Sequence, residues 1–294
     1  PPPPPPPPPP PHFFYTQKTA NAILSGLVGS EMCIRDSIKI VPLKIRFGDT
    51  EFVDRVELTT EQFWEKCQAS DELPSTAAPS PGAFVEEFQN AASEGATGVV
   101  AIILSGELSA TIEAAQQAAQ LVKDEIEVRV IDSRTVTLGL GSVVMGAASA
   151  ANSGANIEEV AAIASDSVNR TQVHAALDTL ENLRKGGRIG AAGSLLGSML
   201  SIKPLIEVRN GVVEPAGKQR TRGKALGYLV GVVEQNADQI EQIFVTHAAC
   251  DDVESFVEQV KSVVSVEVLV GEVGPVVGAH AGIGTIGVAF QTAT

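Results

Sequence analysis

The sequence predicts an α/β protein of two domains, an N-terminal domain built on a parallel sheet and a C-terminal domain built on a mixed sheet. The chain has 294 residues, about twice the length of an average domain of about 150 residues. In its first half, runs of valine and isoleucine alternate with amphipathic helical segments, which is typical of a parallel sheet covered on both faces. In its second half, the Asn-Gly pair at residues 210–211 predicts a hairpin and therefore antiparallel strands. We expect the domains to cover residues 38–165 and 166–294.

Residues that favour helix ends indicate where the helices of the N-terminal domain begin. Thr59 and Gln62 match a capping box, and Ser80 followed by Pro81 is a favoured helix start. Ser109 is expected to cap a third helix. The pattern predicts strands over residues 40–47, 99–104 and 128–131, and helices over residues 60–69, 81–93, 110–123, 138–154 and 157–169.

The C-terminal domain has the same element types in a less regular order. The pattern predicts strands over residues 173–177, 243–246 and 266–270, a hairpin within residues 202–213, and helices over residues 179–184, 221–234 and 251–264. A hairpin among alternating strands and helices is the reason for expecting a mixed sheet.

Residues 1–37 fit neither domain. Residues 1–11 are all proline, which makes an extended polyproline II segment of the kind that SH3-type domains bind. Residues 12–37 lack sustained periodicity, and the stretch LSGLVGSEMCIRDS at 24–37 resembles a translated sequencing adaptor. We therefore expect residues 1–37 to be an artefactual or disordered segment.

Composition and charge exclude several classes of protein. Lysine and arginine total 21 against 35 aspartate and glutamate, a net charge of -14, so general electrostatic binding to nucleic acid or to a membrane surface is not expected. The strongest apolar run, residues 98–104, is far shorter than the roughly 18 residues of an integral membrane segment. Cys33, Cys67 and Cys250 form no disulfide or zinc pattern, which indicates the reducing cytoplasm.

Two hydroxyl residues and one histidine are the main candidates for a binding site. Thr76 lies in a proline-bounded loop before a helix, and Ser109 directly follows a parallel strand, where ligands settle in open α/β sheets. Together they could hold a carboxylate or a phosphate, and each could equally be an ordinary cap or turn residue. His280 lies among glycines, where the backbone leaves room for a ligand.

Basic residues gather in two short stretches. RKGGR at 184–188 and KQRTRGK at 218–224 hold seven of the 21 cations. This clustering fits a phosphoryl group or an acidic partner protein, and it fits simple exposure to solvent equally well.

The sequence does not support dinucleotide binding, a serine hydrolase or a metal site. A GxGxxG spacing at 282–287 lacks the following acidic residue that a dinucleotide site needs. The chain has no GxSxG elbow, and its four histidines are not paired at metal-ligand spacing. We expect neither a metal nor a cofactor.

Seven stretches between residues 38 and 290 carry a resemblance to a known family. They are IVPLKIRFGDTEFVD, LPSTAAPSPGAF, SGELSAT, VIDSRTVTLGLG, LDTLENLRKGGRIG, SIKPLIEVRNGVVEPAGKQRTRGKAL and GPVVGAHAGIGTIGVAF. On these stretches the chain resembles the DegV family, the fatty-acid-binding subunits of bacterial fatty acid kinase. Seven matches in the same order are far more specific than any one of them.

The resemblance implies two α/β domains that enclose one long-chain fatty acid and present its carboxylate to a separate kinase, which forms an acyl phosphate. By position, Thr76 matches the family's carboxylate-binding threonine, Ser109 the serine of its Leu-Ser-Gly-Thr turn, and His280 the histidine of its terminal Gly-Thr-His-x-Gly motif. Arg220 falls in the basic segment that the family places near the headgroup.

Arg188 and Arg222 are further candidates for contacts with the headgroup or with the partner. We expect an apolar tunnel between the domains, with residues 195–206 as a candidate wall. The family's first strand should precede residue 38, where the unusual segment stands, so the sheet is expected to lack a strand. Ala110 and Ile283 replace a usual glycine and proline, which affects the expected chain selectivity more than the headgroup site.

The interpretation that follows is a non-catalytic, cytoplasmic carrier of a long-chain fatty acid that works with a fatty acid kinase. One alternative is a regulatory protein that senses a lipid. A second, less favoured alternative is an acyl hydrolase that uses Ser109 with His280, for which the sequence offers neither an elbow nor an identifiable acid.

Overall fold

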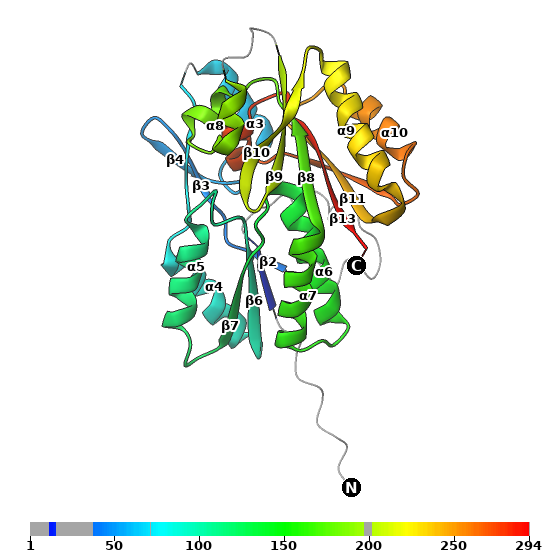
Figure 1. The fold of residues 1–294 in the computed structure, drawn as a ribbon. Coiled ribbons are helices and arrows are strands. Elements are labelled where there is room, and N and C mark those ends of the chain that lie inside the picture. The colour runs from blue at the N-terminus through cyan, green and yellow to red at the C-terminus, as the bar shows by residue number, and fades with distance from the viewer. Residues whose placement is uncertain (1–11, 16–37, 71, 197–201, 294) are drawn as a thin grey trace.

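The described residues of the protein form three β-sheets with helices packed against them (Figure 1). A computed structural model describes residues 12–15, 38–70, 72–196 and 202–293. A parallel sheet lies in the N-terminal part of the chain, a mixed sheet in the C-terminal part, and a small antiparallel sheet beside them. The predicted fold class, a two-domain α/β protein with a parallel and a mixed sheet, is confirmed.

The N-terminal sheet has four strands, all of them parallel. Their order is β2 (Ile38–Ile40), β1 (His12–Tyr15), β6 (Gly98–Ile103) and β7 (Glu127–Asp132). Every residue of β6 is buried, which explains why its run of valine and isoleucine shows no polar alternation. The covering helices are α4 (Pro81–Ser93) and α5 (Thr111–Leu121) on one face, and α6 (Thr137–Asn152) and α7 (Ile157–Arg170) on the other (Figure 1).

Strand β1 lies between β2 and β6, in a segment where the sequence predicts no strand. Residues 12–15 pair in parallel with both neighbours, so the sheet does not lack the strand whose absence the family pattern suggests. Their sequence, HFFY, suits a strand because aromatic residues are enriched in strands. A run this short gives no periodicity to detect. The proline tract and the rest of residues 1–37 lie outside the described residues.

A small antiparallel sheet and one helix form a separate layer. The strands lie in the order β4 (Thr50–Val53), β3 (Lys44–Phe47) and β5 (Ser75–Ala77), and the helix is α3 (Thr60–Ala69). The predicted capping box at the start of α3 is present, with Gln62 N donating to Thr59 Oγ1 at 3.2 Å. The single strand predicted over residues 40–47 is in fact two, because Pro42 interrupts the ladder. The chain thereby passes from the parallel sheet into the small sheet.

The C-terminal sheet has six strands of mixed direction. Their order is β10 (Val212–Gln219), β9 (Lys203–Arg209), β8 (Thr171–Ala176), β13 (Ile286–Thr292), β11 (Ile240–His247) and β12 (Val268–Glu272). Only β11 and β12 pair in parallel. The predicted hairpin joins β9 to β10, and Asn210 and Gly211 both have the positive φ, 54° and 86°, that such a tight turn requires.

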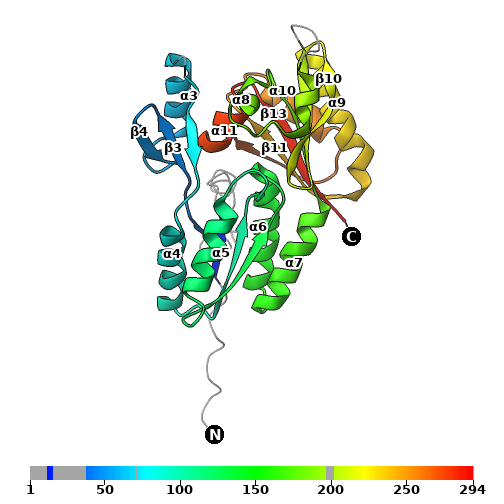
Figure 2. The ribbon, with the colours of Figure 1, turned by 60° about the vertical axis from the view of Figure 1, so that its left-hand side comes forward.

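Helices connect the sheets to one another. On one face of the six-stranded sheet lie α9 (Arg222–Asn236) and α10 (Val253–Lys261), while α6 packs against its other face. The short helices α8 (Glu181–Lys185) and α11 (Pro275–Ala281) contact each other, and α11 also contacts α3, β3 and β5 (Figure 2). The predicted boundary between residues 165 and 166 falls inside α7, which contacts strands of both large sheets. Within the described residues, no helix has the length and apolar character needed to cross a bilayer.

Candidate functional site

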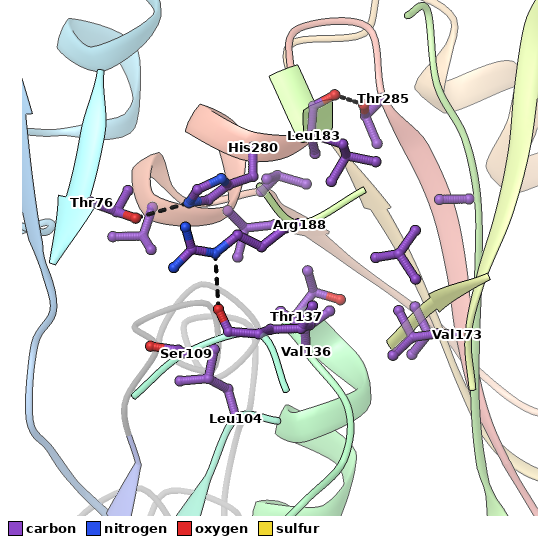
Figure 3. Close-up of a pocket in the computed structure, with 18 of the residues that line it drawn as sticks. Thr76, Leu104, Ser109, Val136, Thr137, Val173, Leu183, Arg188, His280 and Thr285 are labelled. Atoms are coloured by element: carbon purple, nitrogen blue, oxygen red, sulfur yellow. Dashed lines mark hydrogen bonds between the residues drawn. The ribbon is translucent and has the colours of Figure 1, made fainter. Parts of the chain in front are cut away.

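An apolar pocket lies between the carboxyl ends of β6 and β7 and one face of the six-stranded sheet (Figure 3). Leu104 and Leu108 line it from the loop after β6, Val136 from the loop after β7, and Val276 from α11. Its empty space amounts to about 1090 Å³, which includes a part open to solvent. Counted as the space that the centre of a water molecule can reach, the cavity measures about 190 Å³, and most of the residues that line it are apolar.

The alternation of side chains along β8 and β9 explains why the sheet side of the pocket is apolar. Val173 and Ala175 of β8 and Ile206 and Val208 of β9 point to the pocket, as the two-residue period of a strand requires. Residues at the intervening positions, such as Ala176, point to the opposite face and join the core under α9. The predicted wall over residues 195–206 contributes Ile206, whereas residues 197–201 lie outside the described residues.

Thr76 and His280 meet at one end of the pocket. Thr76 belongs to β5 and His280 to α11, and Thr76 Oγ1 and His280 Nε2 share a hydrogen bond of 2.8 Å (Figure 3). Burial, assisted by the positive charge of Arg188, lowers the pKa of His280 to about 4. The imidazole is therefore neutral at neutral pH, so it supplies hydrogen bonding without a charge.

A glycine makes room for the imidazole. A Cβ atom placed on Gly186 would lie 2.3 Å from His280 Nδ1, so no larger residue fits there while the ring keeps its place. The same Nδ1 atom is buried and has no hydrogen-bond partner among the described residues. The position of His280 thus depends on the close contact between α8 and α11.

Ser109 lines the pocket from the loop after β6. The sequence predicts that it caps the next helix, and this is wrong in detail: the N-cap of α5 is Ala110, which offers no side-chain bond. The Ser109 hydroxyl instead shares a 2.8 Å hydrogen bond with Thr111 Oγ1, whose side chain is fully buried. A hydroxyl has one donor and two acceptor positions, so Ser109 can accept from Thr111 and still donate to a ligand.

Arg188 brings a positive charge to the same end of the pocket. Its Nε donates to Leu108 O at 3.1 Å and its Nη1 to Gly186 O at 2.6 Å. These bonds hold the side chain across the pocket beside His280 (Figure 3). No acidic group in the described part of the chain forms an ion pair with Arg188, so its charge remains open to an anionic ligand. Sequence reasoning named Arg188 only as a secondary contact, because a cluster of cations does not show which of them folds inward.

The structure places the other two predicted arginines elsewhere. Arg220, predicted to assist the headgroup, is exposed in the turn between β10 and α9 and does not line the pocket. Arg222 begins α9, and its Nε and Nη2 donate to the two carboxylate oxygens of Asp252 at 2.9 Å each. It also donates to Gly284 O. These contacts give Arg222 a structural role at the start of α9, and neither Arg220 nor Arg222 lines the pocket.

His174 and His247 belong to strands of the six-stranded sheet. His174 is buried in β8 and stacks on Phe290 with a ring separation of 6.1 Å. Burial lowers the pKa of His174 and of His247. Across the described ranges no three His, Cys, Asp or Glu side chains lie close enough together to hold a metal ion.

These features define a class of protein, a two-domain α/β protein with an apolar ligand pocket whose polar end carries two hydroxyls, a neutral histidine and one arginine. A family model described as an uncharacterised protein of the DegV family matches residues 27–293. The chain belongs to the DegV family, as the seven sequence stretches indicate.

Bacterial relatives match over most of their length. A DegV domain-containing protein of Streptomyces coelicolor is 34% identical over 262 residues, which cover 88% of this chain and 92% of the relative. A second, from Deinococcus radiodurans, is 35% identical over 255 residues, which cover 85% of this chain and 90% of the relative.

Solved structures of the family share the fold. One of a DegV family protein from Thermus thermophilus, described as fatty acid binding, has a TM-score of 0.84 and 28% identity, and the match covers 96% of this chain and 99% of that one. A structure of DegV from Bacillus subtilis, described as a fatty acid binding protein, has a TM-score of 0.83 and 26% identity with the same coverage. Fatty-acid binding therefore occurs among members of the family.

Proposed function

We propose that this protein binds one long-chain fatty acid in the apolar pocket and presents its carboxylate to a separate fatty acid kinase, which phosphorylates it to an acyl phosphate. The observation that carries the proposal is the polar end of the pocket, where Thr76, Ser109, His280 and Arg188 all line one apolar cavity. That combination matches a molecule with a long hydrocarbon chain and a single anionic group.

The headgroup is held by charge-assisted hydrogen bonds. A carboxylate that leaves water must find donors of equal quality. Arg188 supplies the positive charge, and Ser109 can donate while it accepts from Thr111. Thr76 can donate to the carboxylate when His280 Nε2 carries the proton and donates to Thr76. The low pKa of His280 keeps a second positive charge out of the site, so a phosphorylated product is not held too tightly.

The hydrocarbon chain supplies most of the affinity. Each methylene that leaves water contributes about 0.8 kcal/mol, so a chain of about 16 carbons contributes on the order of 10 kcal/mol. The valine and leucine side chains along the face of the six-stranded sheet and the loops after β6 and β7 provide the surface for this contact.

Exposure of the headgroup residues supports presentation to a second protein. Thr76, Ser109 and Arg188 are half-buried rather than enclosed, so a bound carboxylate lies within reach of a kinase. Lys218, Arg220 and Lys224 are exposed between the end of β10 and the first turn of α9, and they offer a basic surface to an acidic partner on a chain whose net charge is -14. Because the chemistry uses ATP, the proposed location is the cytoplasm.

The test combines the purified protein, loaded with palmitic acid, with a bacterial fatty acid kinase and ATP. Acyl phosphate is trapped with hydroxylamine and measured as the hydroxamate. The carrier role predicts product that depends on this protein, on the kinase and on ATP together. A kinase that is active with its own carrier but makes no product with this one would favour the lipid-sensing alternative.

The contacts of Ser109 weigh against the hydrolase alternative. The hydroxyl of Ser109 is paired with Thr111, and His280 Nε2 is paired with Thr76, so the two do not form a nucleophile and base pair. A histidine with a pKa of about 4 is also a weak base at neutral pH. We expect no turnover of acyl esters.

A further inference from the structure

One side chain in the pocket has no partner within the described residues. Thr246 of β11 lines the pocket and is 4% exposed, and its Oγ1 atom forms no hydrogen bond. Nearly all buried hydroxyls in proteins are hydrogen-bonded, and each exception calls for an explanation. A valine would fill the same volume and match an apolar wall, so the hydroxyl at this position indicates a polar group in the ligand.

A second threonine, Thr285, lines the same pocket from the position just before β13. Thr246 pairs with Gly287 of β13, and Ala248 N donates to Thr285 O, so the pairing continues to Thr285 and puts both threonines on the pocket side of the sheet. Thr285 Oγ1 donates to Ala281 O at 2.8 Å, which leaves its acceptor positions open. Thr246 can donate, and Thr285 can accept.

The space next to these hydroxyls is the pocket itself, which both Thr246 and Thr285 line. Gly287, opposite Thr246, has no room for a side chain, because a Cβ atom there would lie 2.7 Å from His174 O and 3.3 Å from Thr246 Cγ2. The wall around it is otherwise apolar, with Val273 and Val276 close by along the pocket. Thr285 lies on the side of the pocket away from Thr76 and Ser109 (Figure 3), and Thr246 pairs with Gly287, two residues farther along the chain from α11. Both hydroxyls therefore face the chain of the ligand and not its headgroup.

We propose that the pocket is built for a long-chain fatty acid that carries a hydroxyl group on its chain. The ligand hydroxyl accepts a hydrogen bond from Thr246 and donates one to Thr285, which uses one donor and one acceptor on each side. A keto group would satisfy Thr246 alone, and an unsubstituted chain satisfies neither. This inference rests on the proposed function, because it assigns the ligand class of the same site.

The experiment compares stearic acid with a series of hydroxystearic acids that differ in the carbon that carries the hydroxyl. Affinities are measured on delipidated protein by displacement of a fluorescent fatty acid. In the wild type, one isomer is expected to bind about tenfold more tightly than stearic acid, and isomers with the hydroxyl elsewhere more weakly than stearic acid. In Thr246→Val, which keeps the side-chain volume, this preference is expected to disappear while stearic acid binds as tightly as before or more tightly.

A matched variant controls for the loss of a buried hydroxyl as such. Thr135 is 3% exposed, its Oγ1 also lacks a partner within the described part of the chain, and it does not line this pocket. Thr135→Val is expected to keep the preference of the wild type. Two results would overturn the inference. In the first, every hydroxystearic acid binds to the wild type more weakly than stearic acid does, as expected if a water molecule is the partner of Thr246. In the second, the preference persists in Thr246→Val. If neither stearic acid nor any isomer binds, the proposed function itself fails and this inference falls with it.

Discussion

Replacement of Gly186 by alanine tests how the headgroup site is held together. The new Cβ atom would lie 2.3 Å from His280 Nδ1 and 2.9 Å from its Cε1, about 1 Å closer than ordinary van der Waals contact. The imidazole cannot retreat directly, because Thr76 Oγ1 already lies 2.8 Å from Nε2 on the other side of the ring. The ring must therefore rotate, or Thr76 must move, and their hydrogen bond is lost in either case.

The expected size of the effect follows from that one bond. A net hydrogen bond contributes about 1 kcal/mol, which corresponds to about fivefold in affinity. We expect Gly186→Ala to weaken palmitic acid binding by about this factor, because Thr76 loses the partner that orients its hydroxyl. The backbone itself tolerates alanine, since Gly186 has φ of -76°.

A double-mutant cycle shows whether the effect acts through His280. In a His280→Ala background the imidazole is absent, so Gly186→Ala is expected to cost nothing further. Gly227→Ala in α9 is the control, because a Cβ there meets no atom within 4 Å, and it should leave binding unchanged. Affinity is measured by calorimetric titration of delipidated protein. Unchanged binding in Gly186→Ala, or an equal loss in the two backgrounds, would refute the reasoning.

Three further predictions concern the same site. Ser109→Ala and Thr76→Val are each expected to weaken fatty-acid binding about tenfold without a change in the melting temperature of more than a few degrees, and full affinity in the double variant would remove both residues from the site. Arg188→Gln is expected to weaken binding about 10- to 100-fold by titration, whereas Arg220→Gln, an exposed arginine outside the pocket, should bind normally; equal losses would contradict the assignment. Folding lowers the pKa of His280 from 6.5 to about 4. As the pH falls, the imidazole therefore gains its proton in the unfolded chain before it does so in the folded chain. The free energy of unfolding should therefore fall by about 3 kcal/mol between pH 6.5 and pH 4 because of this residue. Urea unfolding of wild type and His280→Gln across that range checks it, and identical slopes would count against the burial of a neutral imidazole.

The parts of the fold that are visible in the sequence are those with strong local signals. The capping box at Thr59 and Gln62 starts α3 where it was expected, and Asn210 with Gly211 forms the expected turn. The sequence pattern predicts neither helix α11 nor strand β13. The first has only seven residues between glycines, and the second is buried along almost its whole length and therefore shows no alternation. Their places depend on contacts with distant segments.

The difference between local signals and tertiary packing also explains which site residues can be predicted from the sequence. Thr76, Ser109 and His280 stand in local sequence patterns, and all three line one pocket in the structure. Arg188 and Arg220 belong to similar basic clusters, and only tertiary packing decides that Arg188 folds into the pocket and Arg220 faces solvent. The threonines of the sheet are beyond sequence reasoning of this kind, because an unpartnered hydroxyl is recognised only from its surroundings.

The central claim is that the pocket holds a long-chain fatty acid by its chain and its carboxylate. Native mass spectrometry of the protein freshly purified from bacteria tests this most directly. The account predicts one retained molecule with the mass of a long-chain fatty acid in the wild type, and a much smaller bound fraction in the variant that combines Thr76→Val with Ser109→Ala. A wild-type protein that carries no such molecule, and takes none up from added palmitic acid, would contradict the account.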